Sequence, residues 1–429
     1  MRIAEYNKEI FLRSEEGLSE EEIKDALKES LVDGLTNVLI VPPDYTRFHS
    51  NAGFITNYYY HELIDRGVKV DILPALGTHV AMSDEELTKM YGDIPHDVFI
   101  AHNWREDVVS LGKVPKEYLS EISEGLWEED IEVEVNKLIM DEKYDLIISV
   151  GQVVPHEVVG MSNHAKNLFV GAGGSRMINS SHMLGAVYGM ERMMGKDKTP
   201  VRQLYDYGFE HYLKDRPIIF VQTVTTAPGG NIHTHGLFIS KGRRCFEEAV
   251  KSVQETNIDF VDKPFKKCIV YLDPEEFKST WLGNKAVYRT RMAMADGGEL
   301  IILAKGVDKF GEDKEIDKLI RKYGYKGRLN TLEKFNSEEG ADLRNNMSAA
   351  AHLIHGSSDD RFSITYAVGN ITREEIESVG YKSADYNEMA SKYHLDELTY
   401  GYNIVDGEEI YFVPNPALGL WIDKNKFSE

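Results

Sequence analysis

The sequence has little cysteine, and it lacks long apolar runs. Its 429 residues include two cysteines, Cys245 and Cys268, too few for a disulfide framework or a cysteine-rich zinc module. The two thiols either form one bond or stay reduced, and reduced thiols are the simpler interpretation. No run of about 18 apolar residues occurs, which excludes a membrane-spanning helix. The first residues, MRIAEYNKEIFLRSEEG, lack the apolar core of a signal peptide, so we expect a cytoplasmic protein.

Positive charge is also scarce. Lys and Arg number 49 against 71 Asp and Glu, a net charge of −22. Nucleic acids and anionic membranes are bound by clustered Lys and Arg, so the composition argues against both as partners. A small anionic substrate remains compatible, because a local pocket can oppose the field of the whole protein.

What the sequence does contain is an alternation of apolar β-branched runs with helical patterns. Strands are predicted at 38–41, 70–73, 146–150 and 217–221, and a helix at 51–66. Strand, helix and strand in succession form the unit of a parallel sheet. We therefore predict an α/β fold of two domains, each with a largely parallel sheet flanked by helices, and a cleft between them.

A second block begins after a polar stretch that contains Pro264. It has predicted strands at 268–272 and 299–303, a helical pattern at 275–295, and a turn at Asp296-Gly297-Gly298. We place the N-terminal domain at residues 1–265 and the C-terminal α/β domain at 266–404. A predicted strand at 410–414 returns to either domain, so the segment 405–429 could complete the first one.

Polar motifs follow three of the predicted strands. Residues 44–47, 77–79 and 151–156 each come directly after a strand. Ligands of α/β sheets bind where strands end, so these loops predict one shared site. In the first motif, Arg47 suits a carboxylate or phosphate, and the alternative is a turn fixed by Asp44.

Four histidines lie in loops beside glycine: His79, His156, His164 and His182. No tight ligand spacing links them, so acid–base, metal-binding and purely structural roles all remain open.

Other candidates are weaker. The segment Gly171–Ser175 lacks the third glycine of a dinucleotide fingerprint, so a phosphate nest or a tight turn is favoured. Lys166 is either solvated or a nucleophile with a depressed pKa. His233 and His235 either chelate a metal or lie in a polar loop. Ser19 is a predicted helix N-cap.

The predicted helix of the second domain has a basic and aromatic face. Lys285, Tyr288 and Arg289 share it, with Trp281 and Arg291 nearby. The face is either a lip over the site or solvent surface, and we favour the surface.

Taken in order, these motifs resemble the lactate racemase family, whose members use a nickel-pincer nucleotide. The resemblance runs from about residue 38 to 190 and rests on a D-x-T-R motif, a G-T-H motif, a His-Glu-x-x-Gly segment and the spacing of a Lys and a His after it. The matching residues are Asp44, Tyr45, Thr46, Arg47, Gly77, Thr78, His79, His156, Glu157, Gly160, Lys166 and His182. The block after residue 266, with Lys285, fits less strongly.

The resemblance implies roles for these residues. Lys166 would carry the nickel-pincer nucleotide covalently, and His182 would be the protein ligand of nickel. His79 and His156 would be the acid–base pair. The motif at 44–47, with Asp44, Tyr45, Thr46 and Arg47, and Lys285 would contact the cofactor or the substrate anion. The implied reaction inverts C2 of a 2-hydroxy acid by proton-coupled hydride transfer through a 2-keto acid. Enzymes that make the cofactor are implied as partners.

Two positions depart from the family pattern. Asn163-His164 stands where Gly-Gly often precedes the tether Lys, and Leu282 stands where lactate-specific members have Gln. These departures favour the branch that epimerises sugar acids of the gluconate and mannonate type, with His164 and the basic helix meeting a polyol chain. A lactate or other short 2-hydroxy acid racemase is the alternative. A zinc hydrolase and a non-catalytic binding protein are the alternatives from other classes.

Overall fold

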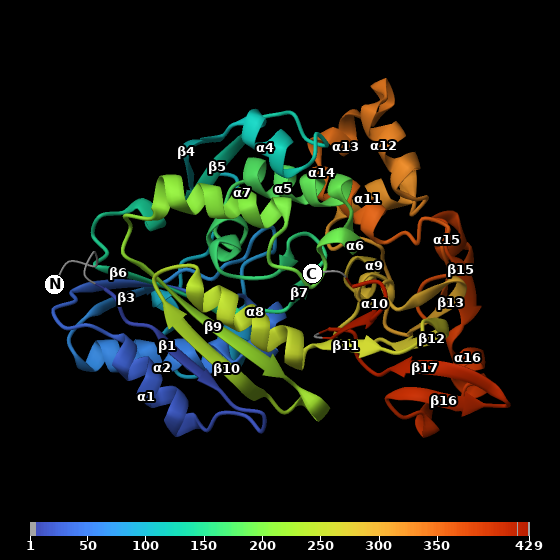
Figure 1. The fold of residues 1–429 in the computed structure, drawn as a ribbon, viewed down its shortest axis with the longest axis horizontal. Helices are drawn as coiled ribbons and strands as arrows, with labels where there is room; N and C mark the ends of the chain where they lie inside the picture. The colour runs from blue at the N-terminus through green and yellow to red at the C-terminus, as the bar shows by residue number, and fades with distance from the viewer. Residues whose placement is uncertain (1–5, 418, 428–429) are drawn as a thin grey trace. The chain divides into compact units, whose positions relative to one another are not determined.

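The chain divides into two units of dense internal contact. In the computed structural model, which describes residues 6–417 and 419–427, unit 1 comprises residues up to 184 together with 194–257. Unit 2 comprises residues 185–193 and those from 258 onward. Each unit has its own sheet (Figure 1).

Unit 1 is built on a six-stranded sheet in the order β1-β10-β9-β6-β2-β3. The four strands β9, β6, β2 and β3 are parallel, while β10 is antiparallel to β9 and to β1. The bounds are β1 Ile10–Arg13, β2 Asn37–Val41, β3 Lys69–Ile72, β6 Leu146–Gln152, β9 Ile218–Thr226 and β10 His233–Ser240. The four predicted strands of the first block are therefore confirmed.

Helices cover both faces of this sheet. Ile55 and Tyr59 of α2 pack with Ile40 and Ile148 on one face, and α8 contacts β9 and β10 (Figure 1). The helices are α1 Glu20–Ser30, α2 Ala52–Asp65, α3 Asp84–Tyr91, α4 Lys116–Ile122, α5 Ser175–Tyr188, α7 Pro200–Gly208 and α8 Arg244–Thr256. Two antiparallel pairs join them, β4 Val108–Val114 with β5 Ile131–Asn136, and β7 Pro155–His156 with β8 Gly160–Met161.

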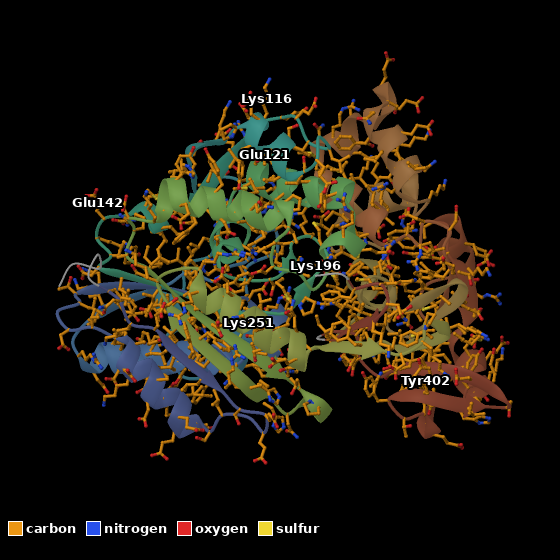
Figure 2. The ribbon with its side chains drawn as sticks, viewed as in Figure 1. Lys116, Glu121, Glu142, Lys196, Lys251 and Tyr402 are labelled. Atoms are coloured by element: carbon orange, nitrogen blue, oxygen red, sulfur yellow. The ribbon has the colours of Figure 1, made fainter. Side chains whose placement is uncertain are left out.

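Helix boundaries in unit 1 follow local sequence signals. Ser19 caps α1 and forms a capping box with Glu22, as predicted. Charged side chains cover the outer surfaces of the helices: Lys116 and Glu121 on α4 and Lys251 on α8 are exposed (Figure 2). The apolar side chains are thereby left to the sheet faces, where burial stabilises the unit.

Unit 2 has a second six-stranded sheet in the order β15-β14-β13-β12-β17-β16. Only β16 is antiparallel to its neighbour. The bounds are β12 Phe265–Tyr271, β13 Met294–Ala304, β14 Ser363–Val368, β15 Lys382–Asp385, β16 Gly401–Val405 and β17 Glu408–Val413, with β11 Ile258–Val261 and β18 Leu420–Asp423 as a separate parallel pair. Two largely parallel sheets flanked by helices confirm the predicted fold class.

The helices of unit 2 are short. They are α6 Met190–Met193, α9 Thr280–Gly283, α10 Lys285–Thr290, α11 Lys314–Tyr323, α12 Arg328–Asn336, α13 Ala341–Asn345, α14 Met347–His355, α15 Arg373–Ser378 and α16 Tyr386–Lys392. The core of the sheet includes Ile269, Ile301 and Phe412.

The C-terminal segment differs from its predicted alternative. β17 pairs with β12, and β18 pairs with β11, so these two strands of the segment 405–429 belong to unit 2 rather than to the N-terminal unit. The boundary between the two units also lies at residue 258 instead of 266. The boundary differs because β11 pairs with β18, which lies about 160 residues further along the chain. A local sequence pattern does not predict pairing with so distant a strand.

The predicted helix at 275–295 is also wrong in part. It breaks into α9 and α10 at Asn284, whose Oδ1 accepts hydrogen bonds from the hydroxyls of Tyr366 (2.7 Å) and Tyr381 (2.9 Å). β13 then begins at Met294 and includes Gly297, which has φ +73° at an irregularity of the β12–β13 register. Tertiary hydrogen bonds thus override a continuous helical pattern.

The expected solvent face of that stretch is buried. Tyr288, Arg289 and Arg291 are 4%, 2% and 5% exposed. Arg291 donates to Glu191 at 2.9 Å and to the carbonyl of Ser357 at 3.0 Å, within unit 2. The arginines are therefore part of the interior of unit 2.

Candidate active site

Three loops at the carboxyl ends of β2, β3 and β6 carry the predicted site. A direct hydrogen bond joins the first two, because Nδ1 of His79 lies 2.5 Å from Oδ2 of Asp44. Backbone contacts extend the site further: the amide of Gly77 donates to the carbonyl of Gly171, in the segment that follows Lys166. The loops at 44–47 and 77–79 therefore lie side by side as expected, and a single site formed by all three loops stays a prediction.

Asp44 is fixed by its own loop. It caps the 3₁₀-helix Tyr45–Ser50, and its Oδ1 accepts hydrogen bonds from the amide (3.2 Å) and the hydroxyl (2.5 Å) of Thr46. The side chain is 7% exposed. Burial by itself raises the pKa of Asp44. Hydrogen bonds from His79 and Thr46, together with the positive charges of His79 and Arg47, outweigh burial, so the pKa lies below its usual value.

The contact with Asp44 determines which ring nitrogen of His79 carries a proton. An ionised carboxylate only accepts hydrogen bonds, so Nδ1 of His79 carries a proton and donates it. In the neutral ring, Nε2 then holds the lone pair, and the ring is partly exposed, at 45%. A histidine oriented by a buried carboxylate in this way is equipped to accept a proton at Nε2.

His156 is held in a different way. It ends the two-residue strand β7 and is 6% exposed. Its Nδ1 accepts a hydrogen bond from the amide of Val158 at 3.1 Å, so the neutral ring carries its proton on Nε2. A carboxylate oxygen of Glu157 lies 3.6 Å from the same Nδ1 and would stabilise the protonated ring. The two histidines thus present opposite tautomers, one as acceptor and one as donor.

Lys166 lies immediately before a π-helical turn, Asn167–Gly171. Such turns are frequent at functional sites. Its ammonium makes no hydrogen bond or ion pair with any residue in 6–417 or 419–427. Burial, followed by the charge of Arg47, lowers the pKa of Lys166 to about 8, although Glu157 opposes the shift. About a tenth of the amine is therefore unprotonated at pH 7, far more than in an ordinary lysine, and the free amine is the nucleophilic form.

His182 lies on α5, within the electrostatic range of Lys166 and Glu157. Its Nδ1 donates to the carbonyl of Ile178 at 2.6 Å, and Nε2 has no hydrogen-bond partner in the described chain. Burial and then the charge of Lys166 lower the pKa of His182 to about 4, so the ring is neutral at pH 7. A neutral imidazole whose other nitrogen is fixed by a carbonyl is the usual form of a metal-ligating histidine.

Tyr45 does not join this cluster. Its ring packs on Phe48 with 5.6 Å between centroids, and the ammonium of Lys89 lies 5.4 Å from it. Its contacts are those of a packing residue of the loop. Arg47 does act on the site residues, because its positive charge lowers the pKa of both Asp44 and Lys166.

The glycine-rich segment 171–175 is a tight turn. Glu134 of β5 accepts a hydrogen bond from the amide of Arg176 at 2.9 Å, so a carboxylate of the protein itself occupies the first turn of α5. The alternative of a phosphate nest is therefore not supported there. The turn connects Lys166 to the helix that carries His182.

Gly173→Ala is expected to lower the free energy of unfolding by about 2–3 kcal/mol, because a Cβ would lie 1.7 Å from the carbonyl oxygen of Phe169. Urea unfolding measures the change. Gly242→Ala is the control, since a Cβ there meets nothing within 4 Å, and its effect should stay below about 0.5 kcal/mol. Equal stability of the two variants would contradict the packing.

His164 is not a surface or substrate-facing residue. It is 2% exposed, and its ring lies 3.8 Å from Phe220 and 5.5 Å from Phe246 between centroids. The expectation that it meets a polyol chain is therefore wrong, because the aromatic side chains enclose it. His233 and His235 lie on β10, and both nitrogens of His235 bond to Ser14 and Thr226, which favours the structural alternative.

Lys285 belongs to unit 2, where it begins α10. Its ammonium lies 5.5 Å from the ring of Phe277. Both cysteines are buried and free, so the reduced alternative holds. In the described part of the chain, no three His, Cys, Asp or Glu side chains gather in a way that could hold a metal, and no helix is long and apolar enough to cross a membrane.

Two functional candidates received no role from the sequence, although Glu157 stands in the His-Glu-x-x-Gly motif. Glu157 lies beside His156 and acts electrostatically on Lys166 and His182. Its position next to a candidate histidine was the available signal. Arg202 is fully buried beside the loop that carries Lys166, and no sequence signal distinguishes it from a surface arginine.

The lactate racemase N-terminal domain matches residues 13–194. Among curated proteins, none matches this sequence. A crystal structure of a Thermotoga maritima protein is similar, with a TM-score of 0.83 and 24% identity, covering 96% of this chain and 100% of that one. The lactate racemase apoprotein from Thermoanaerobacterium thermosaccharolyticum is also similar, with a TM-score of 0.70, 16% identity and coverage of 95% and 93%. At these identities the two structures show a shared fold. Residues 13–194 of this chain therefore carry a lactate racemase N-terminal domain.

Proposed function

We propose that this protein is a 2-hydroxy acid racemase or epimerase that carries a nickel-pincer nucleotide on Lys166. One observation carries the proposal: Lys166, whose pKa is lowered to about 8, lies in the electrostatic range of His182, whose Nδ1 is fixed by the carbonyl of Ile178. The first supplies an amine for covalent attachment and the second a neutral nitrogen ligand, which suits nickel. The lactate racemase N-terminal domain at residues 13–194 supports the activity class, an isomerase.

The residues present fit such a group. Within the described residues the protein offers no three-ligand metal cluster, so a metal bound at His182 would need most of its donors from a cofactor. When bound, the pincer nucleotide would supply soft donors for nickel and an electron-poor ring that accepts and returns hydride. Arg47, near Lys166, would hold an anionic group of the cofactor or the substrate.

The two histidines would move the hydroxyl proton. His79, with its lone pair on Nε2, would take the proton of the substrate hydroxyl while the C2 hydrogen leaves as hydride, which gives a 2-keto acid. His156, once protonated to the imidazolium beside Glu157, would return a proton to the carbonyl oxygen when hydride is returned to the opposite face, and its ring would become neutral. Asp44 stabilises the charge on His79, and Glu157 does so for His156.

For the substrate we propose a sugar acid of the gluconate or mannonate type. Leu282 supports this substrate class, because it stands where lactate-specific members have Gln, three residues before Lys285. His164 gives no support, because its side chain is buried in the core. Assays with a panel of 2-hydroxy acids decide this point. Turnover of aldonates above lactate supports the proposal, whereas efficient turnover of lactate alone makes the short-acid alternative correct.

The proposed cofactor is tested by intact mass and nickel analysis of protein produced together with the cofactor biosynthesis enzymes. We expect a nucleotide-sized adduct on Lys166 and about one nickel per chain, as a single-histidine site implies. His182→Ala should keep the adduct and lose nickel. If a known family member is loaded in parallel and this protein acquires neither adduct nor nickel, the proposal is wrong, and activity with zinc alone or binding without turnover would then identify the other classes.

A further inference from the structure

Arg202 is a buried charge that the proposed chemistry does not use. It lies on α7 and is 0% exposed. Its Nη2 donates to the carbonyl oxygens of Met161 (2.7 Å) and Asn163 (3.1 Å). Its Nε and Nη1 have no hydrogen-bond partner in the described residues. A buried guanidinium with unused donors is costly, so its retention calls for a role beyond packing.

The two carbonyls that Arg202 binds belong to a strained turn. Asn163 and His164 both have left-handed backbones, with φ of +67° and +56°. Side chains with a Cβ disfavour this region, and two such residues in succession are unusual. Strain of this kind persists only where the surroundings fix it.

Several contacts fix the turn. Oδ1 of Asn163 accepts a hydrogen bond from the amide of His164 at 2.7 Å. The ring of His164 is enclosed by Phe209, Phe220 and Phe246. The guanidinium of Arg202 itself lies 4.2 Å from the ring of Phe246, so it is anchored to the same aromatic cluster.

The conformation of the Asn163-His164 turn determines the position of Lys166. Lys166 follows His164 by two residues, and the amide of Asn167 donates to the carbonyl of His164 at 2.9 Å, which starts the π-helical turn. A change in the turn would therefore move both the lysine and the first residue of that helix.

We infer that Arg202 is the positioning residue of Lys166, because it binds the carbonyls of Met161 and Asn163 and so holds the left-handed turn that precedes the lysine. The inference rests on the proposed function only for the importance of Lys166. The placement itself stands on the hydrogen bonds, and it is tested without the cofactor.

The test compares R202M and R202K with R216M. Arg216 is a matched control in the same unit, since it also donates to two carbonyls, those of Ile139 (3.0 Å) and Asp141 (2.7 Å), but in a loop without site residues. In the apoprotein, amide hydrogen exchange at 161–172 should be about tenfold faster in R202M, while R216M should change only the region around 139–143. Unchanged exchange at 161–172 in R202M overturns the inference.

Loading of Lys166 gives a second readout at a temperature where all variants are folded. The adduct should fall about tenfold in R202M, and R202K should restore part of it, because an ammonium keeps the charge and reaches one carbonyl. R216M should load as the wild type does, and an equal loss in R216M overturns the inference. If R202M does not fold, R202K is compared with R216K by the same exchange measurement. Faster exchange at 161–172 with no adduct even on the wild type would support the positioning role and refute the proposed cofactor.

Discussion

Lys166→Arg is expected to abolish both the covalent adduct and all racemisation. Arginine keeps the positive charge, but its guanidinium stays protonated and is no nucleophile at neutral pH. The change therefore removes the free amine with little change in charge or size. Intact mass and a racemisation assay measure the two losses. Lys69→Arg, at an exposed position of β3, is the matched control and should keep both properties.

The reactivity of Lys166 in the apoprotein has a defined pH dependence. Its pKa of about 8 means that the amine is mostly protonated below pH 8 and mostly free above it. An ordinary lysine reaches that point only near pH 10.4. Trace acetylation followed by peptide mass analysis should therefore show a midpoint near pH 8 for Lys166. A midpoint near that of an ordinary lysine would show that burial and Arg47 do not act on it as described.

His79→Asn is expected to lower kcat by about 10²–10⁴-fold, the usual contribution of a general base. Asn has no titratable nitrogen to take the hydroxyl proton. Asp44→Asn should cost about 10²-fold or more, because an amide in place of the carboxylate no longer stabilises a protonated ring and can reverse its tautomer. Both variants should still acquire the adduct, since neither change removes Lys166. The assay uses the 2-hydroxy acid that the substrate panel identifies.

The chain offers a matched control for this pair. His61 lies 2.9 Å from Asp93 in an exposed histidine–aspartate contact of the same unit. Asp93→Asn should leave kcat unchanged within about twofold, as for a surface pair of little energetic weight. Full activity of His79→Asn, or an equal loss in Asp93→Asn, would remove His79 from the acid–base pair.

Local sequence predicted the elements that frame the site. The strands β2, β3 and β6 follow from short apolar β-branched runs, and the parallel arrangement follows from the helical segments between them. Because parallel strands end at one edge, the proximity of Asp44 and His79 was also predictable. Elements that depend on distant partners were not, as the break at Asn284 and the pairing of β11 with β18 show.

The sequence by itself determined the α/β class, the strands that precede Asp44 and His79, and the family resemblance on which the proposed roles depend, whereas His182, expected in a loop, lies on α5. Tertiary structure alone decided the chemical state of each candidate. It fixed opposite tautomers on the neutral rings of His79 and His156, lowered the pKa of Lys166, kept His182 neutral and placed His164 in the core. The reason is physical: a pKa and a tautomer depend on burial and on the charges and hydrogen bonds nearby, and distant parts of the chain supply these.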